Sequence, residues 1–137
     1  MADKSEGAVG LFEQGHNCAQ AVFAAFAEEL GLDEEMALRI SSGFGGGIAQ
    51  TRETCGAITG MLMASGIKFG YIHPKDKDEK AALNNELKAM MKQFTDVYGT
   101  VNCAKLLALG KEQGIDKPCN AYVELAVKIT EEKFSSK

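Results

Sequence analysis

A chain of 137 residues with 45% hydrophobic and 25% charged side chains has the size and composition of one soluble domain. Its formal net charge is −4 and it contains no long basic run, which argues against binding to nucleic acid. The longest apolar run without a charge, residues 55–67, is shorter than the ~20 residues of a membrane span, so no span is expected. Residues 1–6 are polar and lack the apolar core of a secretory signal, which predicts a cytoplasmic protein.

Helical periodicity dominates the chain, and no stretch shows the sustained alternation of a β-strand. Polar capping residues precede most of the periodic segments, and a glycine follows most of them. In chain order the pattern predicts a short turn at 8–12 and helices at 17–31, 33–43, 54–70, 74–98, 102–110 and 117–134. No linker divides the chain, so we predict an all-α, single-domain bundle of about five to seven helices over residues 1–137.

Glycines mark two places where the backbone should pack closely. Gly56, Gly60 and Ala64 recur every four residues on the central apolar helix and form a bare stripe that a second helix could approach. Residues 43–47 contain four glycines directly before that helix. We interpret this loop as a turn that allows close packing, and a backbone nest for an anion is the alternative.

The chain has four cysteines, and each lies where a helix is expected to begin: Cys18, Cys55, Cys103 and Cys119. Asn17, Thr54 and Asn102 are good N-cap residues, and each would place the cysteine that follows it at the first helical position. For the fourth helix Asp116 is the expected cap, with Pro118 in the first turn. Free amides and the helix dipole stabilise negative charge at such positions, so thiolates form more easily there.

The spacing of the cysteines matches no local motif. There is no C-x-x-C pair, so neither a thioredoxin-type pair nor a zinc ribbon is indicated, and any site must be assembled by the fold. A single cysteine is most often a small buried hydrophobe, but four at helix starts favour thiol chemistry. Among other candidates, His16 and Arg52 lie near cysteines in the sequence, although residues of these types before a helix are more often solvated.

The segment CGAITG at 55–60 contains Gly56, Ala57 and Gly60 in the pattern CGAxxG. Together with GHNCAQAVF at 15–23 and the glycine-rich stretch before the motif, it resembles the C_GCAxxG_C_C family, described as redox-active proteins. All four family cysteines are present, and the resemblance covers nearly the whole chain. It implies a small prokaryotic-type protein of redox character. A related module occurs with haem-binding segments in split-Soret-type cytochromes, but this chain has no C-x-x-C-H site, so covalent haem is not expected.

Two hypotheses follow for the four cysteines. In the first, they converge and perform thiol–disulfide exchange or electron transfer as a thiol-dependent oxidoreductase, with Cys55 as the most reactive thiol. In the alternative, all four bind metal and hold an iron–sulfur cluster or zinc. A redox function requires a redox partner, which the sequence does not identify. A homodimer is a further prediction, because methionine-rich faces often serve interfaces; the residues concerned are Met61, Met63, Met90 and Met91.

Overall fold

The computed structural model describes residues 4–136, which form seven α-helices, a short 3₁₀ turn and no strand. The all-α prediction is therefore confirmed for this part of the chain. The elements in chain order are α1 (Lys4–Glu13), α2 (Cys18–Ala25), α3 (Glu34–Ser41), η1 (Ser42–Phe44), α4 (Gly56–Phe69), α5 (Lys77–Tyr98), α6 (Cys103–Glu112) and α7 (Cys119–Ser135).

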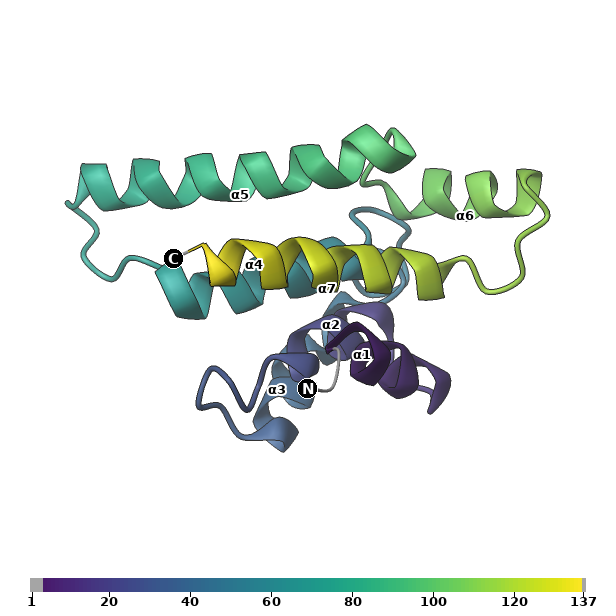
Figure 1. The fold of residues 1–137 in the computed structure, drawn as a ribbon, viewed down its shortest axis with the longest axis horizontal. Helices are drawn as coiled ribbons and strands as arrows, with labels where there is room; N and C mark the ends of the chain where they lie inside the picture. The colour runs from purple at the N-terminus through teal and green to yellow at the C-terminus, as the bar shows by residue number, and fades with distance from the viewer. Residues whose placement is uncertain (1–3, 137) are drawn as a thin grey trace.

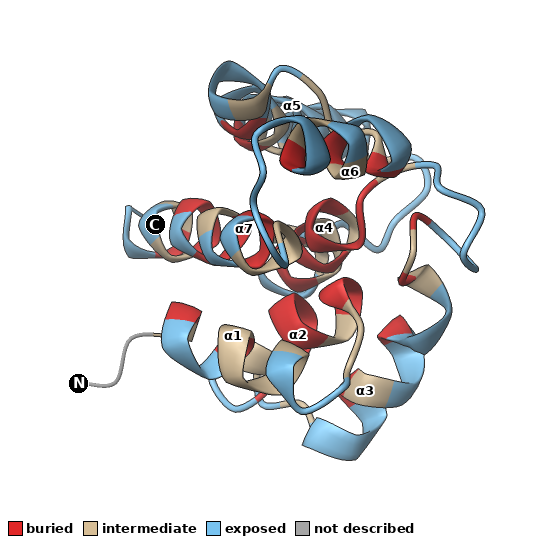
Figure 2. Ribbon diagram, turned by 90° about the vertical axis from the view of Figure 1, so that its right-hand side faces the viewer, coloured by how far each residue is buried: buried red, intermediate tan, exposed pale blue. Residues whose placement is uncertain are grey.

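The helices lie in three layers, and the middle layer consists of α4 and α7 (Figure 1). On one side of this layer are α5 and α6, and on the other are α1, α2 and α3. The buried residues of α2, α4 and α7 face the interior between the layers (Figure 2). The core therefore runs along both faces of the α4–α7 layer, as expected for stacked amphipathic helices.

The small-residue stripe of α4 packs directly against α2, as its spacing predicts. A Cβ atom added to Gly60 would lie 2.8 Å from the carbonyl oxygen of Ala19 and 3.1 Å from the Cβ of Val22. One added to Gly56 would lie 2.9 Å from the Ala19 amide nitrogen. Because no side chain separates the two backbones, the first turn of α2 is held beside the first turn of α4, and Ala64 continues the buried stripe.

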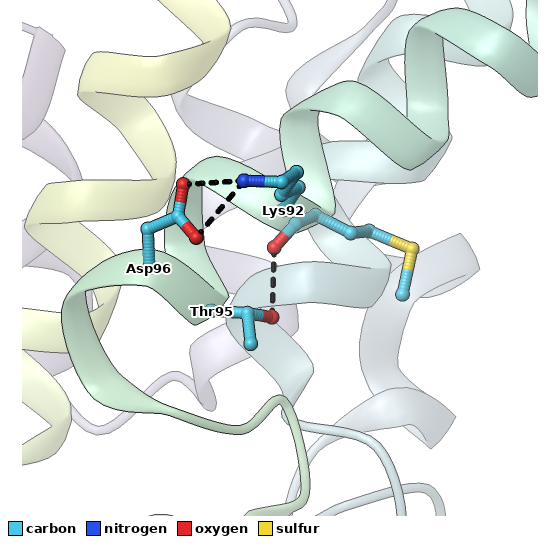
Figure 3. Close-up of polar contacts among 4 residues, drawn as sticks. Lys92, Thr95 and Asp96 are labelled. Carbon is cyan, nitrogen blue, oxygen red and sulfur yellow. Dashed lines mark hydrogen bonds and ion pairs between the residues drawn. The ribbon is translucent and has the colours of Figure 1, made fainter.

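The buried face of α5 attaches this long helix to the bundle. Met90 and Phe94 are fully buried, whereas the outward face carries an ion pair from Lys92 Nζ to the Asp96 carboxylate at 3.1 Å (Figure 3). The Thr95 hydroxyl donates a hydrogen bond to a backbone oxygen one turn earlier (Figure 3). Both partners of the ion pair are more than half exposed, so it adds little stability.

Several predicted boundaries differ from the structure. The segment predicted at 17–31 stops being α-helical after Ala25, because the amides of Phe26 and Ala27 bond to oxygens three residues back and tighten the chain. The turn expected at 8–12 is part of the ten-residue helix α1. The helix predicted from residue 74 begins at Lys77, where the Asp76 side chain accepts a hydrogen bond from the Glu79 amide at 3.0 Å.

The four methionines on which the homodimer prediction depends do not form an exposed face. Met61 and Met90 are fully buried, and Met63 and Met91 pack partly buried against the core. They therefore give no support for a homodimer, which stays a prediction.

No helix within residues 4–136 combines the length and the hydropathy that a bilayer span requires. Residues 1–3 and Lys137 lie outside the described part of the chain. The prediction of a cytoplasmic protein depends on residues 1–6, so it lies partly outside the described residues. Both ends of the predicted 1–137 domain lie outside them as well.

Candidate functional site

The N-termini of α2, α4, α6 and α7 meet at one place, and each brings a cysteine. Cys18, Cys103 and Cys119 are the first residues of their helices. Cys55 is one position earlier, as the N-cap of α4. Three of these side chains are at most 8% exposed, while Cys119 is only partly buried. Cys119 is thus the thiol that an incoming molecule reaches most easily.

All four cysteines line a single cavity of about 200 Å³. The cavity is mostly apolar, and its polar groups come from one asparagine, one glutamine, one arginine and one tyrosine. The lining residues are Phe12, Asn17, Cys18, Gly46, Gly47, Gln50, Arg52, Cys55, Gly56, Cys103, Leu106, Leu107, Cys119 and Tyr122.

A short backbone pairing joins the start of α4 to the start of α6. Thr54 and Asn102 form an isolated antiparallel bridge. On either side of it, the Cys55 amide donates to the Val101 oxygen at 2.8 Å and the Cys103 amide donates to the Glu53 oxygen at 2.6 Å. Because Thr54 is engaged in this bridge, it does not cap α4 as predicted, and Cys55 takes the cap position.

The start of α2 is fixed by a capping box and by the glycine-rich loop. The Asn17 side chain accepts from the Gln20 amide at 2.8 Å, and the Gln20 side chain accepts from the Asn17 amide at 3.0 Å. Asn17 also donates to the Ser42 oxygen at 3.0 Å, and Gly45 lies against its side chain. The predicted Asn17 and Asn102 caps are confirmed.

The predicted cap of the last helix is wrong by two residues. Pro118 occupies the N-cap position of α7 and its carbonyl accepts from the Ala121 amide at 3.0 Å, so Asp116 lies outside the helix. Proline needs no partner for an amide, which makes it compatible with a helix start. The placement of Cys119 in the first turn is nevertheless as predicted.

The loop between η1 and α4 contains a left-handed turn. Five consecutive residues, 46–50, have φ between 51° and 73°, and Ile48, Ala49 and Gln50 among them are not glycines. L-residues in this conformation cost roughly 1–2 kcal/mol each. Backbone bonds that reach six residues back compensate, such as the Arg52 amide to the Gly46 oxygen at 2.9 Å. The close packing predicted for the glycines is confirmed, because Gly47 lies against Cys103 and the Arg52 backbone.

This turn places Arg52 at the cavity. Arg52 is exposed, as the sequence suggested. Its Nη1 nevertheless donates a weak hydrogen bond to the Sγ of Cys103 at 3.8 Å. Its charge also acts on Cys119, where it favours the thiolate. The arginine three residues before Cys55 therefore acts on two other cysteines of the cluster.

Cys18 and Cys119 line the same cavity and interact, which shifts their pKa values in opposite directions. Hydrogen bonding to Cys119, together with burial, raises the pKa of Cys18 far above its usual range. For Cys119, the hydrogen bond from Cys18 and the charge of Arg52 lower the pKa to about 7, although burial opposes them. We assign the negative charge to Cys119, because it is more exposed and the charge of Arg52 favours its thiolate. Cys18 remains protonated and is the hydrogen-bond donor.

The pKa of Cys55 is shifted in the opposite direction from that of Cys119. Burial raises its pKa to about 11, and the nearby amides of Ala57 and Ile58 offset only part of this rise. A helix N-terminus therefore does not by itself produce a thiolate, because desolvation destabilises the buried thiolate more than the neighbouring amides stabilise it.

Some lining residues were not predicted from the sequence. Tyr122 lies one turn after Cys119 on α7, and its hydroxyl donates to the Leu106 oxygen at 2.6 Å, which ties α7 to α6. Its three-residue spacing from Cys119 was a usable signal for a shared helix face. Gln50 had no such signal, because only the left-handed turn places it at the cavity.

Within residues 4–136, no three side chains of histidine, cysteine, aspartate or glutamate are arranged to hold a metal ion. The four thiols share one cavity, but the described arrangement is not that of a preformed metal centre.

The fold and the site define a small helical protein with four cysteines around one cavity. The chain belongs to the C_GCAxxG_C_C family, whose sequence profile matches residues 16–133 and is described as "Putative redox-active protein (C_GCAxxG_C_C)". The match includes all four cysteines and the CGAxxG motif, so the predicted family is confirmed, and membership supports a redox role.

A relative from Archaeoglobus fulgidus is 28% identical over 138 residues, which cover 89% of this chain and 87% of the relative, and it is described as an uncharacterized protein. No solved structure matches significantly.

Proposed function

We propose that the protein is a thiol–disulfide exchange protein in which Cys119 attacks and Cys18 resolves. The observation behind this proposal is that Cys18 and Cys119 line one cavity, in which Cys119 is the most exposed of the four thiols. Hydrogen bonding between the two thiols lowers the pKa of Cys119 and raises that of Cys18, which favours a thiolate at Cys119. A low-pKa thiolate beside a second thiol is the arrangement that disulfide exchange requires.

The reaction has two steps. The Cys119 thiolate attacks one sulfur of a substrate disulfide, a mixed disulfide forms on Cys119, and the other half of the substrate leaves as a thiolate that takes a proton from water. Cys18 then loses its proton and attacks the Cys119 sulfur, which releases the second half. Two cysteine thiols have become one disulfide, and the substrate disulfide has become two thiols. A dithiol reductant reverses the cysteine oxidation and closes the cycle.

This assignment replaces Cys55 with Cys119 as the attacking thiol. Cys55 is 4% exposed and its pKa is raised, so little thiolate exists there near neutral pH. Cys119 is more exposed and its pKa is lowered. Cys55 and Cys103 remain candidates for a second redox pair, because the Thr54–Asn102 bridge holds the starts of their helices together.

Graded oxidation of the reduced protein should first produce one disulfide, between Cys18 and Cys119. The thiolate and its neighbouring thiol react fastest, while the other two cysteines are buried and lack this pairing. Peptide mapping of alkylated samples identifies the bridge. A first disulfide between Cys55 and Cys103, or no intramolecular disulfide at all, contradicts the proposal.

Alkylation of Cys119 by iodoacetamide should rise with pH and reach half its maximum near pH 7, because only the thiolate reacts. Cys55 should stay slow throughout the range from pH 5 to pH 9. Arg52→Gln should move the Cys119 midpoint to higher pH, since a positive charge that favours the thiolate is lost. Arg39→Gln is the matched control, because Arg39 is the only other arginine and lies on α3, outside the cavity. Equal midpoints in all three proteins contradict the role given to Arg52.

Four cysteines around one cavity also equal the ligand count of a zinc or iron–sulfur site, so metal content is a required control. Protein purified without oxygen is analysed for zinc, iron and sulfide before oxidation. Stoichiometric metal with four protected thiols would replace the exchange proposal by the metal-binding alternative. Four titratable thiols without metal support exchange.

A further inference from the structure

A single arginine supplies the charge that lines the cavity. Among its lining residues Arg52 is the only acidic or basic side chain, apart from the cysteines themselves. None of the ion pairs formed within residues 4–136 involves Arg52. Its guanidinium therefore faces the cysteines without a carboxylate to neutralise it, and it can still bind an anion through several N–H donors.

Neutral hydrogen-bonding groups lie near this charge. Gln50 lines the cavity beside Gly46, and its side chain covers the position where a Cβ of Gly46 would be. Asn17 lines the cavity as well. A molecule that enters thus meets a cation, amide groups and sulfur atoms on otherwise apolar walls.

The size of the cavity limits what can bind. Its volume of about 200 Å³ is below the ~300–1,000 Å³ of pockets that hold drug-sized ligands. A nucleotide or a folded peptide segment does not fit, whereas a compound with a few heavy atoms on each side of a disulfide can place one half inside.

We propose that the substrate is a small disulfide that carries carboxylate groups, with one carboxylate bound by Arg52 and the adjacent sulfur placed at Cys119. This inference rests on the exchange function proposed above and adds the class of substrate. Arg52 is then the residue that determines specificity.

In the first step, the bond between Cys119 Sγ and the near substrate sulfur forms while the substrate S–S bond breaks, and the electron pair leaves with the far half as a carboxylate-bearing thiolate. That half takes a proton from water. In the second step, Cys18 loses its proton and attacks the Cys119 sulfur, and the bond between Cys119 Sγ and the substrate sulfur breaks. The near half leaves as a thiolate, which takes up a proton and dissociates from Arg52. The disulfide substrate is reduced by two electrons and the two cysteines are oxidised by two.

Three disulfides of similar length but different charge test this inference: 3,3′-dithiodipropionate (anionic), bis(2-hydroxyethyl) disulfide (neutral) and cystamine (cationic). The rate at which the free Cys119 thiol is consumed, as mixed disulfide plus Cys18–Cys119 disulfide, is measured by mass spectrometry after acid quenching. Each rate is divided by that of the same disulfide with 2-mercaptoethanol, which removes differences in intrinsic reactivity. The ratio of two substrates on one protein also cancels the thiolate fraction, so a change in the Cys119 pKa does not affect it.

At low ionic strength we expect the native protein to prefer the anionic over the cationic disulfide roughly tenfold or more, and this preference should weaken as salt is added. Arg52→Gln should reduce the ratio to near one, Arg52→Lys should restore part of it, and Arg39→Gln should leave it unchanged. Circular dichroism confirms that each variant is folded.

Equal normalised rates for the three disulfides in the native protein, or an unchanged preference in Arg52→Gln, would overturn the substrate class while leaving the exchange function intact. If none of the three disulfides produced either a mixed disulfide on Cys119 or a Cys18–Cys119 disulfide, the exchange function itself would be overturned.

Discussion

Cys119→Ser should slow reduction of a small disulfide by roughly three orders of magnitude or more, because serine offers no nucleophilic thiolate at neutral pH. Its partner has a different effect: Cys18→Ser should still form the mixed disulfide on Cys119 but not release it, since the resolving thiol is missing. Mass spectrometry distinguishes the two variants, because only Cys18→Ser accumulates an adduct of one substrate half.

The first step should also be slower in Cys18→Ala at pH 7 than in the native protein. Alanine has no hydrogen to donate to the thiolate, and without that hydrogen bond the pKa of Cys119 rises. The difference should shrink as the pH is raised and both proteins become fully ionised. Full turnover by Cys18→Ser, or a native rate in Cys119→Ser, would exclude the proposed pair.

Gly60→Ala should lower the free energy of unfolding by about 1–3 kcal/mol, even though alanine has the higher helix propensity. The new Cβ meets the backbone oxygen of Ala19 at 2.8 Å, and a backbone cannot rotate away as a side chain can. α2 and α4 must therefore separate slightly. Chemical denaturation followed by circular dichroism measures the loss, and the movement of α2 should also disturb the Cys18–Cys119 pair.

Gly66→Ala on the same helix is the matched control. A Cβ there meets nothing within 4 Å, so the alanine should raise the free energy of unfolding by about 0.5–1 kcal/mol through its better helix propensity. A loss of similar size in both variants would mean that the α2–α4 contact is not the cause.

Much of the helical framework could be predicted because its signals are local. The Asn17 and Asn102 caps, the Asp33 cap of α3 and the Gly99 end of α5 each depend on a few adjacent residues. The stripe at Gly60 was also readable, since a four-residue period on an apolar helix has one simple packing solution. Family membership agreed with these local features.

The arrangement of the site was not predictable in the same way, because it depends on contacts between distant segments. Threonine is a common N-cap residue, but Thr54 pairs with Asn102 instead. No local sequence pattern indicates this pairing. The left-handed turn that contains Gln50 requires positive φ angles, which residues other than glycine disfavour. Backbone hydrogen bonds to the surrounding loop offset this conformational cost. The choice of Cys119 over Cys55 likewise required their burial, which helix position alone does not give.

The order of the two paired thiols along the chain has a consequence for biosynthesis. A ribosome synthesises Cys18, Cys55 and Cys103 before α7, which contacts α1, α2 and α4 in the finished fold. Until α7 docks, Cys119 has neither the hydrogen bond from Cys18 nor the nearby charge of Arg52 that lower its pKa. The proposed nucleophile thus becomes activated only when α7 is in place, and a nascent chain that lacks α7 exposes ordinary thiols to its surroundings.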